Sequence, residues 1–345
     1  MKILVRGTNW IGDAVMTIPA LRELRRIFPS AQLALHTRGW ARGIFQDADF
    51  LDEIIAFEPA ESKIKDALRQ SKILRARKFD LCILLTNSFE SALVAKLARI
   101  PRRFGYAKEA RSVLLTNSVP IPNWKNERHE VFYYLNLIAE VEKAFLGAQT
   151  VLASEPQTDL TVSAERRRQA REILQTNGVD GSKKIVALGV GSTNSRAKRW
   201  HAESYAALND LLQTRLHAQV VLVGAHDEID VSAEVYARAT VKPFVLTGKT
   251  NLAEAVAILS EADLLVANDM GLAHVAPATG TKTIVIFGPT NEKTTRPFSE
   301  NAIIVRRAVE CAPCMLRDCP IDHRCMTRIS PLEIFAEAET ALQSR

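Results

Sequence analysis

Three segments of the chain carry polar and charged residues directly after short apolar runs. Residues 6–13 read RGTNWIGD and end in Asp13, residues 189–200 read GVGSTNSRAKRW and include Lys198, and residues 268–274 read NDMGLAH. A carboxylate held in place can take the proton of an attacking hydroxyl group. Small residues with exposed amides and hydroxyls beside a cation can bind phosphate. The three segments therefore indicate acid–base chemistry on a phosphorylated substrate.

Asp13 has two interpretations. Gly7 and Gly12 let the backbone turn tightly, and Asp13 opens the predicted helix that follows. Asp is a good helix N-cap, so the carboxylate could be purely structural. It could instead be a general base that faces a cleft between two domains. The segment is not a dinucleotide fingerprint, because the Gly-x-Gly-x-x-Gly spacing is absent.

The second segment predicts a phosphate cradle. Ser192 and Thr193 follow a predicted strand, and Lys198 comes shortly before a predicted helix. The alternative is a basic, solvated loop. It is not a Walker loop, because Gly-Lys-Ser/Thr is absent.

The third segment is the most specific of the three. Asp269 can accept hydrogen bonds from sugar hydroxyls, and the amides from Met270 onward form a helix amino end that favours phosphate. His274 lies one turn into that helix, where a lone histidine is more often a packed residue than a catalyst.

Short apolar strands alternate with helical patterns along the whole chain. The predicted strands are Lys2–Arg6, Gln32–His36, Glu53–Phe57, Asp80–Leu85, Lys184–Val190, Gln219–Gly224, Phe244–Leu246, Asp263–Ala267 and Thr283–Phe287. The predicted helices are Ala14–Phe28, Ser62–Arg77, Ser88–Arg99, Glu127–Phe145, Ala164–Thr176, Ala202–Leu216, Glu228–Ala239, Leu252–Ser260, Gly271–Ala278 and Leu332–Gln343. Apolar strands separated by helices imply parallel sheets covered on both faces.

A polar stretch, Ala153–Asp159, separates two α/β halves of similar size. We expect one Rossmann-like domain over residues 1–155, a second over residues 160–330, and a terminal helix over residues 331–345 that packs back on the first domain. Ser330 is a good cap for that helix. Paired domains of this kind are expected to bind ligands in the cleft between them, at the carboxyl ends of strands.

The composition is that of an ordinary globular protein. The 345 residues carry 45 Lys and Arg against 39 Asp and Glu, a formal net charge of +6, and 6% are aromatic. Disordered and fibrous classes are therefore excluded. Charges close to the amino end do not fit a signal peptide, and no apolar run approaches the ~18 residues of a membrane span. We expect a soluble protein.

Four of the five cysteines gather near the carboxyl end. Cys311, Cys314, Cys319 and Cys325 lie within fifteen residues, together with His323. Such thiols could bind a structural zinc ion, remain unligated in a compact loop, or serve a redox role. The irregular spacing favours unligated thiols, and we predict no metal site.

Basic residues concentrate in the first half of the chain. They are Lys63, Lys65, Arg69, Lys72, Arg75, Arg77, Lys78, Arg99, Arg102, Arg103, Lys108 and Arg111. Such runs are usually solvated helix faces, but they would also suit an acidic partner. The few aromatic residues do not interleave with these cations, so stacking platforms for nucleic-acid bases are not apparent.

The motifs of the chain resemble one family in their order and spacing. The matching segments are Gly12-Asp13, residues 197–200 (AKRW), residues 269–274 (DMGLAH) and residues 287–290 (FGPT). They resemble the ADP-heptose:lipopolysaccharide heptosyltransferases, which are glycosyltransferases. Similarity to the second heptosyltransferase of that family rests on residues 87–93 (NSFESAL), residues 104–106 (FGY) and Arg111. The resemblance implies the GT-B fold, in which two Rossmann-like α/β domains face each other across a cleft.

The resemblance implies a role for each candidate residue. Asp13 would be the catalytic base, and Lys198 would bind the donor diphosphate. The donor-binding residues would be Ser192, Thr193, Glu228, Thr247, Asp269, Met270, Gly271 and His274. The acceptor-binding residues would be Lys63, Arg102, Arg103 and Arg111. For Glu228 a plain surface carboxylate is the alternative, and Met270 stands where relatives often carry Thr or Ser.

The implied reaction is the inverting transfer of L-glycero-D-manno-heptose from ADP-heptose to the inner-core heptose of lipopolysaccharide, without a cofactor or metal ion. The acceptor would be of the heptosyl-Kdo2-lipid A type. We expect a cytoplasmic enzyme at the inner face of the inner membrane, in peripheral contact with that membrane and without nucleic acid. The alternatives are a sugar-nucleotide epimerase of the same architecture and a non-catalytic, basic nucleic-acid-binding protein.

Overall fold

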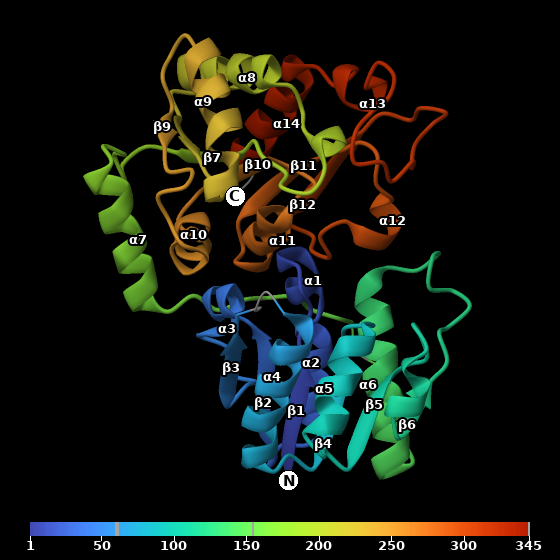
Figure 1. Ribbon diagram of the computed structural model, residues 1–345. Helices are drawn as coiled ribbons and strands as arrows, with labels where there is room; N and C mark the ends of the chain where they lie inside the picture. The colour runs from blue at the N-terminus through green and yellow to red at the C-terminus, as the bar shows by residue number, and fades with distance from the viewer. Residues whose placement is uncertain (59–61, 154, 344–345) are drawn as a thin grey trace. The chain divides into compact units, whose positions relative to one another are not determined.

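The chain folds into two compact units, each built on one parallel sheet (Figure 1). The computed structural model describes residues 1–58, 62–153 and 155–343. The first unit is Met1–Thr158 and the second is Asp159–Arg345. Each sheet has six strands, and the strand pairs in both are parallel.

The strands of the first unit lie in the order β3-β2-β1-β4-β5-β6. They are β1 (Lys2–Arg6), β2 (Gln32–Arg38), β3 (Glu53–Phe57), β4 (Leu81–Leu84), β5 (Arg102–Tyr106) and β6 (Asn117–Val119). The helices are α1 (Ile11–Met16), α2 (Ile18–Ile27), η1 (Gly39–Ala41), α3 (Arg42–Phe45), α4 (Lys63–Arg77), α5 (Phe89–Leu97), η2 (Arg111–Leu114) and α6 (Glu130–Leu146). α2 packs against α6, and α4 packs against α5 in front of the strands in Figure 1.

The strands of the second unit lie in the order β12-β11-β10-β7-β8-β9. They are β7 (Ile185–Gly189), β8 (Gln219–Leu222), β9 (Phe244–Val245), β10 (Leu264–Asn268), β11 (Lys282–Phe287) and β12 (Ala302–Arg306). The helices are α7 (Ala164–Thr176), η3 (Arg196–Lys198), α8 (Ala202–Arg215), η4 (His226–Glu228), α9 (Ile229–Arg238), α10 (Leu252–Leu259), α11 (Gly271–Ala278), α12 (Glu292–Thr295), α13 (Arg324–Thr327) and α14 (Pro331–Gln343). α8 packs against α9 and α14, and α10 packs against α7 and α11.

The two sheets repeat one strand order. Counted from the first strand of each unit, both read 3-2-1-4-5-6, which is the order of doubly wound Rossmann folds. The order reverses between β1 and β4, and again between β7 and β10. Open α/β sheets bind ligands beside such a reversal, at the carboxyl ends of the strands. The loops after these four strands are therefore where each unit is expected to hold its functional residues.

Buried apolar strands form the centre of each unit. β4, β7 and β10 are buried along their whole length, as expected for parallel strands covered on both faces. In the second unit, Leu188 and Val266 from neighbouring strands share a core with Trp200 of the following loop. This packing fixes the strand ends from which the functional loops leave.

Two parts of the predicted pattern differ from the structure. The single helix expected over Ala14–Phe28 is wrong, because α1 ends at Met16 and α2 begins at Ile18. Pro19 lies in the first turn of α2, where its missing N–H would have no intrahelical partner. Strands β5, β6 and β12 also lie outside the predicted set. β6 and β12 are edge strands, and two arginines interrupt the apolar pattern of β5.

The last helix of the described chain packs within the second unit. Ser330 caps α14 as predicted, since the Glu333 amide donates to its Oγ at 3.2 Å. Ile334 and Phe335 join the core of the second unit, and α14 contacts α8, β10 and β11. Packing of this helix on the first domain stays a prediction, as do the domain boundaries at residues 155 and 160.

Candidate functional site

Asn268 ties two loops together where the strand order of the second sheet reverses. It ends β10 and is fully buried. Its Nδ2 donates to the carbonyls of Val190 at 2.9 Å and Gly191 at 3.0 Å. Its Oδ1 accepts from the Trp200 amide at 2.9 Å and the Tyr205 hydroxyl at 3.0 Å. Asn268 thus fixes the loop after β7 against the end of β10, a role that its sequence motif does not reveal.

Lys198 and Asp269 form an ion pair at this edge of the sheet. The distance from Lys198 Nζ to Asp269 Oδ2 is 2.7 Å, and the Thr290 hydroxyl donates to the same oxygen at 2.7 Å. Asp269 is only 6% exposed. A buried carboxylate with two donors has a fixed orientation, so it holds the ammonium group of Lys198 at the amino end of α11. Sequence reasoning singled out the lysine and the aspartate but gave Thr290 no role.

The amino end of α11 carries no side-chain cap. Met270 is the N-cap residue and makes no capping hydrogen bond. Its sulfur packs against Gly189 of β7, where an added Cβ would lie 3.0 Å from Sδ. The amides of the first turn are therefore not capped by the N-cap side chain, and they carry the positive end of the helix dipole. His274, one turn further along, is buried in the unit.

Glu228 is buried beneath two strand ends, which makes the surface-carboxylate alternative wrong. It is 2% exposed, and its Oε2 accepts from the Ala225 amide at 2.9 Å. A Cβ on Gly191 would lie 2.1 Å from its carboxyl carbon, and one on Gly224 would lie 2.7 Å from Oε2. A side chain at either position would therefore displace the Glu228 carboxyl group. Burial raises the pKa of the Glu228 carboxyl above its ordinary value.

The loop after β7 is held at both ends. Arg199 donates from Nε at 3.2 Å and from Nη2 at 3.0 Å to the Ser192 carbonyl. Ser192 is buried, whereas Thr193 at the loop tip is exposed. Thr247, after β9, is buried and shares a 2.7 Å hydrogen bond with the Ser232 hydroxyl. The loop after β7 is thus basic, but hydrogen bonds hold it against the sheet and it is not freely solvated.

Asp13 lies in the first turn of α1 and is not its N-cap. The N-cap residue is Trp10, and the Ala14 amide donates to its carbonyl at 2.9 Å. The helix therefore begins before Asp13, and the plain N-cap interpretation is wrong. Instead the Tyr134 hydroxyl donates to Asp13 Oδ1 at 3.2 Å.

Tyr134 comes from α6 and orients the Asp13 carboxylate. Burial, and then the nearby Asp13, raise the pKa of Tyr134 well above its ordinary value. The phenol therefore keeps its proton and acts as a donor. No local motif could reveal this contact, because the two residues are 121 positions apart.

Arg111 is buried and hydrogen-bonded to neighbouring loops of the first unit. Its side chain is 0% exposed. Its guanidinium donates to the Tyr106 carbonyl at 2.8 Å, to Asn87 Oδ1 at 3.2 Å, and to the Thr86 carbonyl. Burial lowers its pKa to about 10. These bonds fix the loop after β4, so Arg111 positions that loop.

Arg102 and Arg103 lie on the side of the first sheet where the amino ends of its strands are. They begin β5, whereas Asp13 follows the carboxyl end of β1. Arg103 Nε donates to the Leu114 carbonyl at 2.7 Å. The side chain of Lys63 lies outside the described part of the structure. The described acceptor candidates are thus not brought together, and their binding role stays a prediction.

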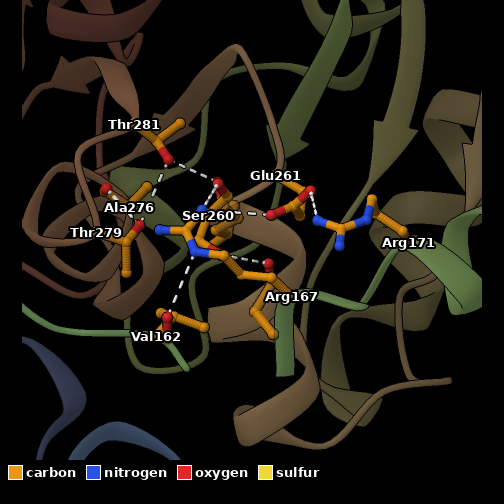
Figure 2. A network of polar contacts seen from close by, with 10 residues as sticks. Val162, Arg167, Arg171, Ser260, Glu261, Ala276, Thr279 and Thr281 are labelled. Atoms are coloured by element: carbon orange, nitrogen blue, oxygen red, sulfur yellow. Dashed lines mark hydrogen bonds and ion pairs between the residues drawn. The ribbon is translucent and has the colours of Figure 1, made fainter. Parts of the chain in front are cut away.

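A second polar network lies where the strands of the second sheet have their amino ends (Figure 2). Arg167 donates to the Ser260 carbonyl at 2.8 Å, and Arg171 pairs with Glu261 at 2.8 Å. The Thr281 hydroxyl donates to the Leu259 carbonyl at 2.6 Å. A polar pocket of about 380 Å³ lies there, lined in part by Arg167 and Thr281. These contacts fasten α7 and β11 to α10, away from the residues predicted to do chemistry.

The four clustered cysteines have no metal-binding arrangement among the residues that the structure describes. No group of three or more His, Cys, Asp or Glu side chains in that part of the chain is placed to hold a metal ion. Burial, followed by the neighbouring thiols, raises the pKa of Cys325 to about 11.

Purified protein is therefore expected to contain substoichiometric zinc. The measurement is elemental analysis of protein purified without chelators and dialysed against metal-free buffer. One zinc ion per chain that survives dialysis would contradict the expectation.

No helix in residues 1–58, 62–153 and 155–343 is long and apolar enough to cross a membrane.

Comparison with solved structures supports the predicted fold. The chain is similar to the structure of Escherichia coli ADP-heptose lipopolysaccharide heptosyltransferase II, with a TM-score of 0.85 and 26% identity over 99% of this chain and 98% of that one. It is also similar to a glycosyl transferase family 9 structure from Veillonella parvula, with a TM-score of 0.85 and 22% identity over 99% and 97% of the two chains. The α/β class and the GT-B architecture are confirmed.

Sequence comparison gives the same family. A lipooligosaccharide heptosyltransferase 2 of Campylobacter jejuni is 28% identical over 100% of this chain and 99% of that protein. The lipopolysaccharide heptosyltransferase 2 of Escherichia coli is 28% identical over 89% and 88% of the two chains. Residues 67–324 match the model of glycosyltransferase family 9 (heptosyltransferase). The resemblance predicted from the motifs is thereby confirmed, and the chain belongs to glycosyltransferase family 9, the heptosyltransferases.

Proposed function

We propose that this chain transfers L-glycero-D-manno-heptose from ADP-heptose to the inner-core heptose of lipopolysaccharide, with inversion at the anomeric carbon. The observation that carries the proposal is the Lys198–Asp269 ion pair at the amino end of α11, where the strand order reverses. The relatives named heptosyltransferase 2 and the likeness to the Escherichia coli ADP-heptose enzyme support the same activity. Membership of a glycosyltransferase family sets the epimerase alternative aside.

Asp13 acts on the acceptor. A hydroxyl group that attacks the anomeric carbon loses its proton as the new bond forms, and a carboxylate can take that proton. The hydrogen bond from Tyr134 keeps the Asp13 carboxylate in one orientation. A single displacement by this hydroxyl inverts the anomeric centre.

Lys198 and the amino end of α11 act on the donor. Negative charge accumulates on the diphosphate as ADP leaves, and a fixed ammonium group with helix amides stabilises that charge. Asp269 holds the ammonium group in place at 2.7 Å. We assign the remaining donor contacts to Ser192, Thr193, Glu228, Thr247, Met270, Gly271 and His274. The mechanism needs no divalent ion.

The acceptor is a heptosyl-Kdo2-lipid A type molecule, and α4 is suited to the membrane that holds it. Ile64 and Leu68 on this helix are 76% and 54% exposed. Lys65 and Lys72 are exposed on the same helix. An exposed helix face with apolar and basic residues binds anionic lipid surfaces. We therefore place the protein in the cytoplasm, in peripheral contact with the inner face of the inner membrane.

A thermal-shift screen of nucleotides tests the proposal. We expect ADP to raise Tm in a concentration-dependent way, because a ligand that binds only the folded state stabilises it. UDP should have little effect and oligonucleotides none. Stabilisation by oligonucleotides without stabilisation by ADP would favour the nucleic-acid-binding alternative.

A further inference from the structure

Arg6 is a buried cation at the end of β1 in the first unit. Its side chain is 7% exposed. It donates from Nη1 to the His36 carbonyl at 3.2 Å and lies 4.2 Å from the centre of the Phe57 ring. Across the chain that the structure describes, Arg6 has no carboxylate within ion-pair distance; Glu90 and Asp66 act on it only from further away. Burial, and then Arg38, lower its pKa to about 10, so it is still charged at neutral pH.

Two buried hydroxyl groups lie at the same edge of the sheet. Thr8 follows β1 and Thr86 follows β4, and they are 6% and 8% exposed. Neither Oγ1 has a hydrogen-bond partner among the described residues. The Leu85 amide donates to the Arg6 carbonyl at 3.1 Å, so the two loops run side by side here. A buried hydroxyl without a partner is costly and therefore uncommon in a folded protein.

The place of these groups in the fold points to a ligand. β1 and β4 flank the reversal of strand order in the first sheet, which is where open α/β sheets bind ligands. The same reversal in the second unit carries Lys198 and Asp269. Guanidinium and hydroxyl groups are the kinds of donor that bind an oxyanion.

We propose that Arg6, Thr8 and Thr86 bind a carboxylate or phosphate group of the acceptor. This inference rests on the proposed function, since it needs an anionic acceptor. The loop that starts at Arg6 leads directly into α1, which carries Asp13. Binding an anion of the acceptor here would orient the acceptor with respect to the base. The three residues are therefore specificity-determining residues of the first unit.

Thr86→Val and Thr8→Val separate binding from stability. If the hydroxyls bind the acceptor, each change raises the acceptor KM by about 3- to 10-fold, the value of one hydrogen bond, and leaves the donor Kd unchanged. Each variant should melt at the wild-type Tm or above, because a buried group without a partner is removed. An unchanged acceptor KM in both variants would overturn the proposal.

Thr281→Val is the matched control. Thr281 is as buried as Thr86, but its hydroxyl donates to a carbonyl in the network of Figure 2. This variant should lower Tm and leave both the acceptor KM and the donor Kd unchanged.

Arg6→Gln tests the charge. Loss of a charged hydrogen bond is expected to raise the acceptor KM by about 10- to 100-fold, and Arg6→Lys should restore part of the difference. Arg25→Gln is the control, because Arg25 is paired with Asp52 at 2.5 Å on the same unit. A KM change of equal size in both variants would indicate a structural effect and overturn the assignment.

The source of the anion is tested with modified acceptors. A dephosphorylated acceptor and a carboxyl-reduced acceptor are each compared with the native one. The modification that removes the bound anion should raise the acceptor KM of the wild type. It should not raise the acceptor KM of Arg6→Gln any further. If both modifications raise the acceptor KM of Arg6→Gln by the same factor as that of the wild type, the proposal is contradicted. Wild-type protein that transfers no heptose to any acceptor would instead contradict the proposed function.

Discussion

Asp13→Asn is expected to lower kcat by about 10²–10⁴-fold, the usual contribution of a general base, with donor Kd nearly unchanged. Asn keeps the shape of Asp and can still meet the Tyr134 hydroxyl, which donates to the carboxylate at 3.2 Å. It cannot take the proton of the acceptor hydroxyl at neutral pH. The measurement is steady-state transfer with saturating donor and acceptor, alongside donor calorimetry.

Tyr134→Phe is the companion variant. The phenol orients the carboxylate but is not the base, so its loss should lower kcat much less than Asp13→Asn does. Circular dichroism should give the same spectrum for both variants as for the wild type. Near-normal turnover in correctly folded Asp13→Asn would return Asp13 to a structural role in the first turn of α1.

Lys198→Ala is expected to weaken donor binding by about 10- to 100-fold and to lower kcat by about 10²–10³-fold. The ammonium group meets the diphosphate before and during bond breaking. The stabilisation by this ammonium group grows as ADP takes up charge, so both the donor Kd and kcat change. Calorimetry with ADP gives the first constant and single-turnover kinetics gives the second.

Lys184→Ala provides the matched control for Lys198. Lys184 Nζ lies 2.7 Å from Asp263 Oδ1, the same distance as in the Lys198–Asp269 pair. It belongs to the amino edge of the second sheet, so its loss should leave ADP binding and kcat unchanged. Equal losses in the two variants would mean that Lys198 acts through the stability of the unit alone.

The sequence predicted the central elements well because their signals are local. Residues 81–85 and 264–267 are apolar runs bounded by polar residues, and the buried strands Leu81–Leu84 and Leu264–Asn268 form there. Ser330 before Pro331 marks the start of α14 as predicted. The sequence pattern did not predict the break between α1 and α2, because apolar residues continue on both sides of Pro19.

The site could be predicted only in part, for a physical reason. Local spacing indicated Lys198 and Asp269, but their ion pair crosses from the loop after β7 to the end of β10. The Tyr134–Asp13 hydrogen bond likewise depends on how α6 packs beside α1. Such contacts follow from the strand order, which no single segment encodes. The concentration of basic residues in the first half of the chain was the least informative signal for a binding site. The guanidinium of Arg111, for example, is buried and donates to a backbone carbonyl.

The most direct test of heptosyl transfer is to incubate the protein with ADP-heptose and a heptosyl-Kdo2-lipid A type acceptor and to analyse both products by NMR. The account predicts that ADP and an acceptor extended by one heptose form in equal amounts. The new anomeric centre should have the configuration opposite to that of the donor. Retained configuration, or consumption of ADP-heptose into an isomerised sugar nucleotide without an extended acceptor, would contradict it.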